Sequence, residues 1–195
     1  MLTVEDGEIT DEYDEFIDIG EILLPKIIKL TGITNEMIEN EGKSESEVAG
    51  ALKERIEPGT LMIAHNAQFD LSFIYELLRR NYPHEADGIV RNAKWLDTLT
   101  VLKDRKNYPH KLCDAVSHYN LGDVNYHRAI DDTMALYRVT HKMIDERNDL
   151  MEYVNVFGFN PKYGISGKRF DFIRYAPQKY HNRGFLPENR ILPKI

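Results

Sequence analysis

The apolar residues of this chain change repeatedly between a strand-like and a helix-like spacing, which limits the folds it can adopt. Residues 1–4 and 8–16 have strand character and flank Asp6 and Gly7. Asp-Gly is typical of a two-residue hairpin turn, because both turn positions need positive φ. Residues 60–64 form a five-residue apolar run, which favours a buried strand. The chain therefore begins with a predicted hairpin and continues with a strand that helices must cover.

Helical patterns separate the predicted strands. Ser44 and Glu47 have the spacing of a capping box, which marks the start of a helix. Two apolar stripes with helical spacing follow, made of Val48, Ala51, Leu52 and Ile56, and of Phe69, Phe73, Ile74, Leu77 and Leu78. Further along, the pattern predicts a strand at 93–97 and helices from 98, over 112–119 and over 129–144. Strands alternating with helices predict an α/β fold in which helices pack on a sheet.

Composition excludes several classes of protein. A chain of 195 residues with 42% apolar content can form one domain with a substantial core. The single cysteine, Cys113, excludes an intramolecular disulfide and fits a reducing compartment. The sequence shows no leader peptide and no long apolar run, so we expect a cytoplasmic protein without membrane contact. A net charge of -7 disfavours a protein that coats duplex DNA.

The amino-acid composition of the sequence changes near residue 155. Residues 156–195 carry eight lysines and arginines against two acidic residues, and they are rich in aromatic side chains and in glycine and proline. We therefore predict a domain at 1–155 and an irregular basic extension at 156–195, with one strand at 169–175. Its rings could stack on the bases of a single strand, or they could pack the extension onto the domain.

Two short segments set a histidine and aspartates close together. Residues 65–70 read HNAQFD and residues 127–132 read HRAIDD. An aspartate near a helix N-terminus is common, because the helix dipole favours it. In combination, however, such segments suit two-metal phosphoryl chemistry, in which carboxylates from separate elements converge on two ions about 4 Å apart.

Three segments resemble one protein family. The HNAxFD and HxAxxD patterns, with PxIxxLTGIT at 25–34 ahead of them, are similar to motifs of the DEDDh 3′-to-5′ exonucleases. The resemblance covers about the first 147 residues and is strongest to the proofreading exonuclease of bacterial DNA polymerase III, including the PolC type. It implies a ribonuclease H-like mixed sheet flanked by helices. It also implies an enzyme that uses two Mg²⁺ or Mn²⁺ ions, acts on DNA 3′ ends and accompanies a replicative polymerase.

The resemblance also implies roles for particular residues. Asp70 and Asp132 correspond to metal ligands, whereas the family spacing disfavours Asp131. His127 corresponds to the general base, a task that suits an imidazole with an ordinary pKa of about 6.5. Asp97 is equally open to a structural and a functional role. Six residues are expected to contact or position the substrate: Thr31, Gly32, Ile33, His65, Asn66 and Phe69.

One motif of the family is missing. Relatives carry Asp-x-Glu on a first central strand, but this sequence starts at the hairpin. We therefore expect a shortened exonuclease whose chain alone forms no five-strand sheet, and metal binding that is weak or limited to one ion. Two alternatives stay open. The chain could be a non-catalytic module that holds a nucleic-acid 3′ end, or an interaction domain that a partner completes with a strand.

Overall fold

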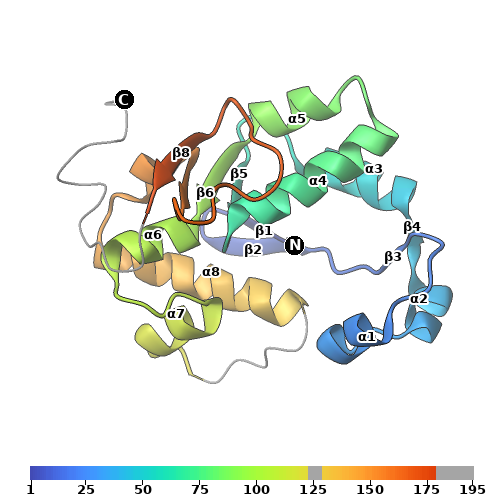
Figure 1. Ribbon diagram of the computed structural model, residues 1–195, viewed down its shortest axis with the longest axis horizontal. Coiled ribbons are helices and arrows are strands. Elements are labelled where there is room, and N and C mark those ends of the chain that lie inside the picture. Colours follow the sequence, from blue (N-terminus) through green and yellow to red (C-terminus); the bar gives the residue numbers. More distant parts are fainter. Residues whose placement is uncertain (123–128, 179–195) are drawn as a thin grey trace.

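The computed structural model describes residues 1–122 and 129–178, and its strands form four separate two-stranded sheets (Figure 1). The pairs are β1 (Leu2–Glu5) with β2 (Glu8–Glu12), β3 (Ile17–Asp18) with β4 (Lys43–Ser44), β5 (Leu61–Ala64) with β6 (Lys94–Asp97), and β7 (Val156–Phe159) with β8 (Arg174–Pro177). The first pair is antiparallel and the others are parallel. The mixed α/β class is confirmed, and the described residues form no five-strand sheet.

Helices connect these pairs. They are α1 (Pro25–Thr31), α2 (Asn35–Glu41), α3 (Glu45–Arg55), α4 (Ala67–Asn81), α5 (Ala86–Asn92), α6 (Thr98–Arg105), α7 (Leu112–His118), α8 (Ala129–Glu146) and a 3₁₀ turn at Leu150–Tyr153. The capping box at Ser44 and Glu47 is present, and the hairpin turn has positive φ at Asp6 and Gly7. Helices α2 and α5 were not predicted. Over the described residues, no helix is both long enough and apolar enough to cross a membrane.

The β5–β6 pair separates two apolar cores, because successive side chains of a strand point to opposite faces. On β6, Trp95 enters a core shared with α3, α4 and α5, whereas Leu96 enters a core shared with α6, α7 and α8. On β7, Phe157 packs in the core that holds Trp95, and Val156 packs in the core that holds Leu96. Residues of the predicted extension are thus part of both cores. The division at residue 155 stays a prediction.

Asn155 joins β6 to the β7–β8 pair. Its backbone has a positive φ of 58°, which asparagine tolerates better than most residues. The Trp95 backbone N–H donates to Asn155 Oδ1 at 2.9 Å, and the Asn155 N–H donates back to the Trp95 carbonyl at 2.7 Å. The Arg174 N–H then donates to the Asn155 carbonyl at 2.8 Å. One residue thereby supplies the ladder bonds between two strand pairs.

Two local predictions were wrong. Residues 60–64 were expected to be buried, but the side chains of β5 are only half-buried, because among residues 1–122 and 129–178 β5 pairs with β6 alone. Phe69 and Phe73 belong to the predicted apolar stripe of α4 but are 58% and 65% exposed, which for Phe69 leaves the expected substrate contact open. Leu71 and Tyr75 take the buried positions instead.

The expected strand at 169–175 was also misplaced. The structure has two strands in this region, β7 and β8, and β8 begins only at Arg174. β7 was missed because its apolar run is short and contains Gly158. The parallel pairing of β7 with β8 could not be inferred from either segment alone.

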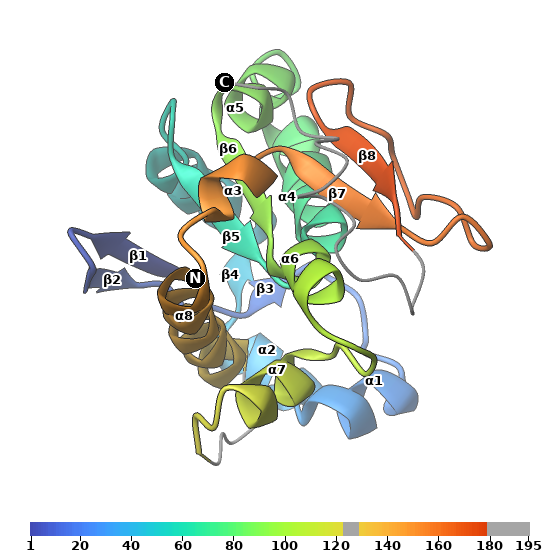
Figure 2. The ribbon, with the colours of Figure 1, turned by 90° about the vertical axis from the view of Figure 1, so that its left-hand side faces the viewer.

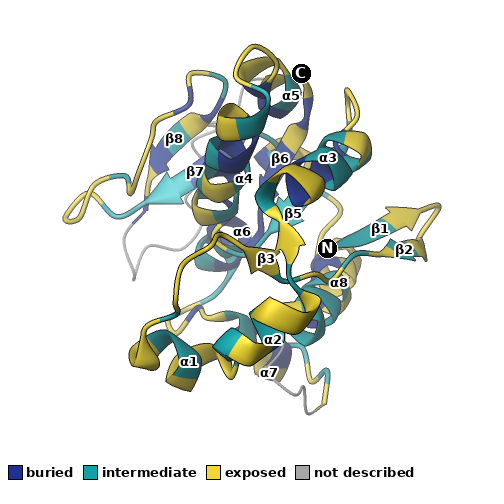
Figure 3. Ribbon diagram, turned by 90° about the vertical axis from the view of Figure 1, so that its right-hand side faces the viewer, coloured by how far each residue is buried: buried dark blue, intermediate teal, exposed yellow. Residues whose placement is uncertain are grey.

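The N-terminal elements lie at the edge of the molecule. Helices α1 and α2 contain no buried residue, and Figure 3 shows both largely exposed. Figures 2 and 3 show the β1–β2 hairpin standing to one side of the β5–β6 pair. The hairpin touches α8, where the Tyr137 hydroxyl donates to the Gly7 carbonyl at 2.7 Å.

Substituting Asn155 tests how the strand pairs are joined. We expect Asn155→Ala to lower the free energy of unfolding by about 2 kcal/mol, because the buried Trp95 N–H loses its acceptor. Asn155→Asp keeps an acceptor oxygen and tolerates positive φ, so it should cost clearly less. Urea denaturation followed by Trp95 fluorescence measures both. Equal losses for the two variants would contradict this role.

Candidate active site

The Asp97 carboxylate fixes how helices α4 and α6 begin at the ends of strands β5 and β6. Its Oδ1 accepts from the backbone N–H groups of Asn66 at 2.9 Å, Ala67 at 3.2 Å and Leu99 at 3.1 Å. The Thr100 hydroxyl donates to its Oδ2 at 2.5 Å. The start of a helix has free N–H groups, which an acidic oxygen satisfies well. Asp97 therefore caps its own helix, α6, and also the neighbouring helix α4.

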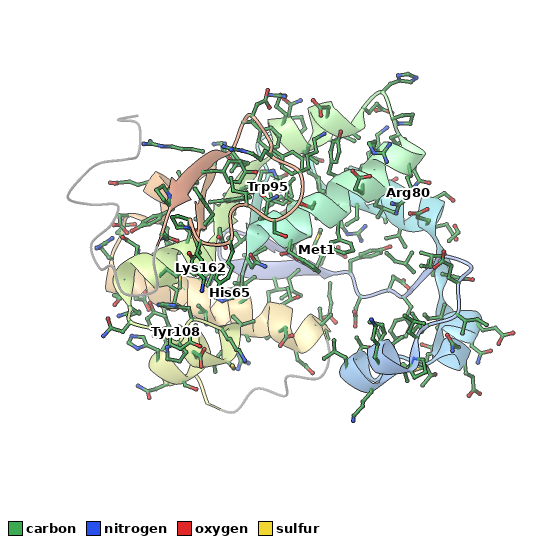
Figure 4. The ribbon with its side chains drawn as sticks, viewed as in Figure 1. Met1, His65, Arg80, Trp95, Tyr108 and Lys162 are labelled. Atoms are coloured by element: carbon green, nitrogen blue, oxygen red, sulfur yellow. The ribbon has the colours of Figure 1, made fainter. Side chains whose placement is uncertain are left out.

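His65 closes the turn between β5 and α4. Its Nε2 lies 2.8 Å from the His110 carbonyl, which can only accept, so this nitrogen carries a proton. Its Nδ1 lies 3.0 Å from the Thr98 hydroxyl. Burial lowers the pKa of His65, which keeps the ring neutral. In Figure 4, His65 lies between Trp95 and Tyr108, well inside the outline of the molecule. Both ring nitrogens have protein partners, and this favours a positioning role.

Asp70 stands on the first turn of α4, the helix that begins directly after the left-handed Asn66. Burial, and to a smaller extent the nearby Asp97 carboxylate, raise the pKa of the Asp70 carboxyl to about 6. A carboxylate that has lost hydration without gaining a cation behaves in this way. The side chain is therefore prepared to gain stability from a positive charge.

The other predicted residues fall into two groups. The Phe69 ring is exposed and packs on Phe73 with centroids 4.6 Å apart. Thr31 and Gly32 end α1, where Gly32 has a φ of 73° and its N–H donates to the Ile28 carbonyl at 2.8 Å. The Ile33 N–H donates to the Thr31 hydroxyl at 3.2 Å. The predicted helical turn ended by glycine is confirmed, and the substrate contacts of these residues stay predictions.

The structure leaves the predicted metal set incomplete. Asp132 lies on the first turn of α8, as Asp70 does on α4. His127 lies outside the described residues. Over the two described ranges, no group of three or more histidine, cysteine or acidic side chains is placed to hold a metal ion. The roles of Asp70, Asp132 and His127 stay predictions.

Sequence reasoning left the role of Asp97 open, although a signal was present. Asp97 ends a strand and stands directly before Thr98, so it has the position of a helix N-cap. Its second task, capping α4, depends on the parallel register of β5 and β6, in which Ala64 faces Asp97. Only the tertiary structure shows that register.

Comparison with known proteins gives a consistent result. A family model described as "Exonuclease" matches residues 1–140. The DNA polymerase III PolC-type of Latilactobacillus sakei is 31% identical over 84% of this chain and 11% of its own length. The PolC-type polymerase of Thermotoga petrophila is 30% identical over 97% of this chain and 13% of its own length. The chain thus spans little more than a tenth of these relatives.

Solved structures agree at the level of the fold. E. coli exonuclease I in complex with a dA16 oligonucleotide superposes with a TM-score of 0.62 at 18% identity, covering 75% of this chain and 36% of that one. Its complex with a dT13 oligonucleotide gives a TM-score of 0.63 at 17% identity, over 78% of this chain and 38% of that one. The same ribonuclease H-like architecture therefore underlies this chain.

The Asp70 carboxyl provides a direct test of this environment. Because its folded pKa is raised to about 6, stability is lost as pH rises from about 4 to about 6, and the loss is constant above that range. We expect Asp70→Asn to stabilise the metal-free protein at pH 7 by on the order of 1 to 2 kcal/mol, and by less at pH 4.5. Denaturation at both pH values measures this. Destabilisation at pH 7, or an Asp70 ¹³C titration midpoint near 4, would contradict it.

Proposed function

Because the chain belongs to the exonuclease family, we propose that it is a metal-dependent 3′-to-5′ exonuclease acting on single-stranded DNA ends. It would release nucleoside 5′-monophosphates in proofreading or DNA processing, which would place it in the cytoplasm. The observation that carries this proposal is the family match over residues 1–140 together with two motif aspartates, Asp70 and Asp132, on the first turns of separate helices.

Two observations bear on the metal. Carboxylate oxygens are the ligands that Mg²⁺ and Mn²⁺ prefer, and the Asp70 carboxyl is largely buried with a raised pKa, so a nearby cation would favour its charged form. We propose that Asp70 and Asp132 hold the cation, whose bound form would activate water and stabilise the leaving oxygen.

His127 is proposed to take the proton from the attacking water. A histidine suits this step, because a neutral imidazole accepts a proton near neutral pH. His65 and Asn66 would hold the start of α4 in place through the contacts of Asp97, and so would fix the direction of the Asp70 side chain. The exposed Phe69 ring would contact the terminal base.

The proposed substrate and partner rest on relatives. The neighbouring exonuclease I structures hold dA16 and dT13 oligonucleotides, which supports single-stranded DNA as the ligand. The PolC-type relatives are DNA polymerase III proteins, which supports a replicative polymerase as the partner.

The first experiment measures release of nucleotides from a 5′-labelled single strand. We expect Mg²⁺- or Mn²⁺-dependent shortening from the 3′ end, and we expect His127→Ala to lower its rate by about 100-fold or more. His84→Ala removes an exposed histidine elsewhere and serves as the matched control. Shortening that continues in EDTA, or equal rates for the two variants, would contradict the proposal.

A second candidate is a module that a partner strand completes. The observation in its favour is β5, an apolar strand with one neighbour, whose side chains remain half-buried. An open strand edge offers unpaired N–H and C=O groups to another strand. The other alternative, a non-catalytic module that holds a 3′ end, would instead bind that end in EDTA without cutting it.

Sedimentation at increasing protein concentration separates this candidate from the first. An open β5 edge predicts dimers or larger species that grow with concentration, because a second copy is the available strand donor. A monomer at every concentration, combined with metal-dependent cutting, would exclude the partner-completed module.

A further inference from the structure

The exposed side of α4 carries two aromatic rings beside Asp70. Residues three or four apart are neighbours on a helix, so Phe73 lies next to Asp70 and to Phe69. The Phe69 and Phe73 rings lie 4.6 Å apart at an interplanar angle of 42°, and both are more than half exposed. Adjacent exposed aromatic rings are unusual on a monomer surface, since burying them would be favourable. This pair is therefore available to a ligand with flat faces.

A basic loop borders the same side of α4. The β7–β8 connection, residues 160–173, is held by Gln68, whose Nε2 donates to the carbonyls of Ser166 at 2.9 Å and Lys168 at 2.7 Å. Gln68 Oε1 accepts from the Tyr175 hydroxyl at 2.8 Å. Gln68 and Ser72 are one turn apart on α4, so the loop runs along the row beside the phenylalanines.

Gly167 allows this close approach. It has a positive φ of 76°, and a Cβ atom built there would lie 3.3 Å from the Ser72 Oγ. A larger residue would therefore be strained and would push the loop away from α4. The loop is fixed against the helix by its backbone, which leaves its charged side chains free for other contacts.

The loop cations have rings as neighbours. Lys162 lies over Tyr163 at 5.2 Å, and Lys168 lies over Tyr75 at 3.8 Å. Within the described part of the chain, neither lysine forms an ion pair with a carboxylate. Cation–π contacts orient an ammonium group without neutralising it. These charges stand on a protein with a net charge of -7, so they form a local attraction for an anion.

We propose that Phe69, Phe73 and the basic loop form a track for single-stranded nucleic acid behind its 3′ end. The inference rests on the proposed function, which places the terminal nucleotide at Asp70. Bases of the following nucleotides would stack on the two rings, and their phosphates would contact Lys162 and Lys168. Rings flanked by cations are the usual means of holding a single strand.

The test compares long and short ligands on the full chain. All variants carry His127→Ala and are measured in Mg²⁺. Fluorescence anisotropy follows the binding of labelled oligothymidylates of about twelve and about three nucleotides. Only the longer strand extends beyond a typical terminal site. Lys162→Gln with Lys168→Gln removes two loop charges. Lys53→Gln with Lys142→Gln removes two charges on α3 and α8 and is the matched control.

We expect the loop variant to lose affinity for the longer strand. The slope of its log binding constant against log salt concentration should be shallower by roughly 1.4, because two single-strand phosphate contacts disappear. Phe73→Ala should weaken the longer strand by about fivefold or more, because one stacking ring is lost. Met151→Ala removes another exposed apolar side chain and should have no such effect. Thermal unfolding confirms that each variant is folded.

Three outcomes would overturn the track. If the background protein binds both strands but the loop variant and its control have the same ratio of long to short affinity, the track is wrong and the proposed function stands. If the loop variant loses as much affinity for a blunt duplex as it loses for the single strand, the loop is a general polyanion site. If the background protein binds neither strand, the proposed function fails together with the track.

Discussion

The arrangement of this molecule depends on one buried carboxylate. Asp97 ends β6, caps α6 and accepts the first N–H groups of α4, so a single side chain sets the relation of two helices to the strands that precede them. The contact continues through Thr100, whose hydroxyl accepts from the Gly158 N–H of β7 at 2.7 Å. A buried carboxylate needs such donors to offset its lost hydration. The Asp97 carboxylate therefore contributes both to packing at the centre of the fold and to the direction of the Asp70 side chain.

β6 is more deeply buried than β5. β6 lies between β5 and β7 and between the two cores, and its side chains from Trp95 to Asp97 are buried. In the part of the chain that the structure describes, β5 pairs with β6 alone and has half-buried side chains, and the β1–β2 hairpin stands beside it as a separate sheet. The candidate site lies where these regions meet. Burial at this position, together with the nearby Asp97 carboxylate, raises the pKa of Asp70 to about 6.

Local chemistry allowed much of the fold to be predicted from the sequence. The hairpin turn at Asp6 and Gly7, the capping box at Ser44 and the long helix α8 each follow from signals within a few residues. Tertiary contacts decided the rest. Phe73 fits a helical apolar stripe, and only the packing of α4 shows that Leu71 and Tyr75 face the core instead.

In the candidate site, too, some features follow from local sequence and others only from tertiary contacts. Its motif residues could be named in advance, because their order and spacing are local properties of the sequence. The anchoring of the basic loop could not, because Gln68 and Lys168 are a hundred residues apart and meet through a backbone carbonyl. Likewise, the cap that Asp97 provides to α4 depends on the strand register.

The central claim is that Asp70 and Asp132 belong to one cation site built on two helix N-termini. Titrating the isotope-labelled protein with paramagnetic Mn²⁺ tests it most directly, because amide signals broaden according to their closeness to the ion. The account predicts that signals around residues 70 and 132 broaden together and first, ahead of the acidic segment at residues 5–21. Broadening that starts in that acidic segment, or that affects only one of the two aspartates, would contradict it.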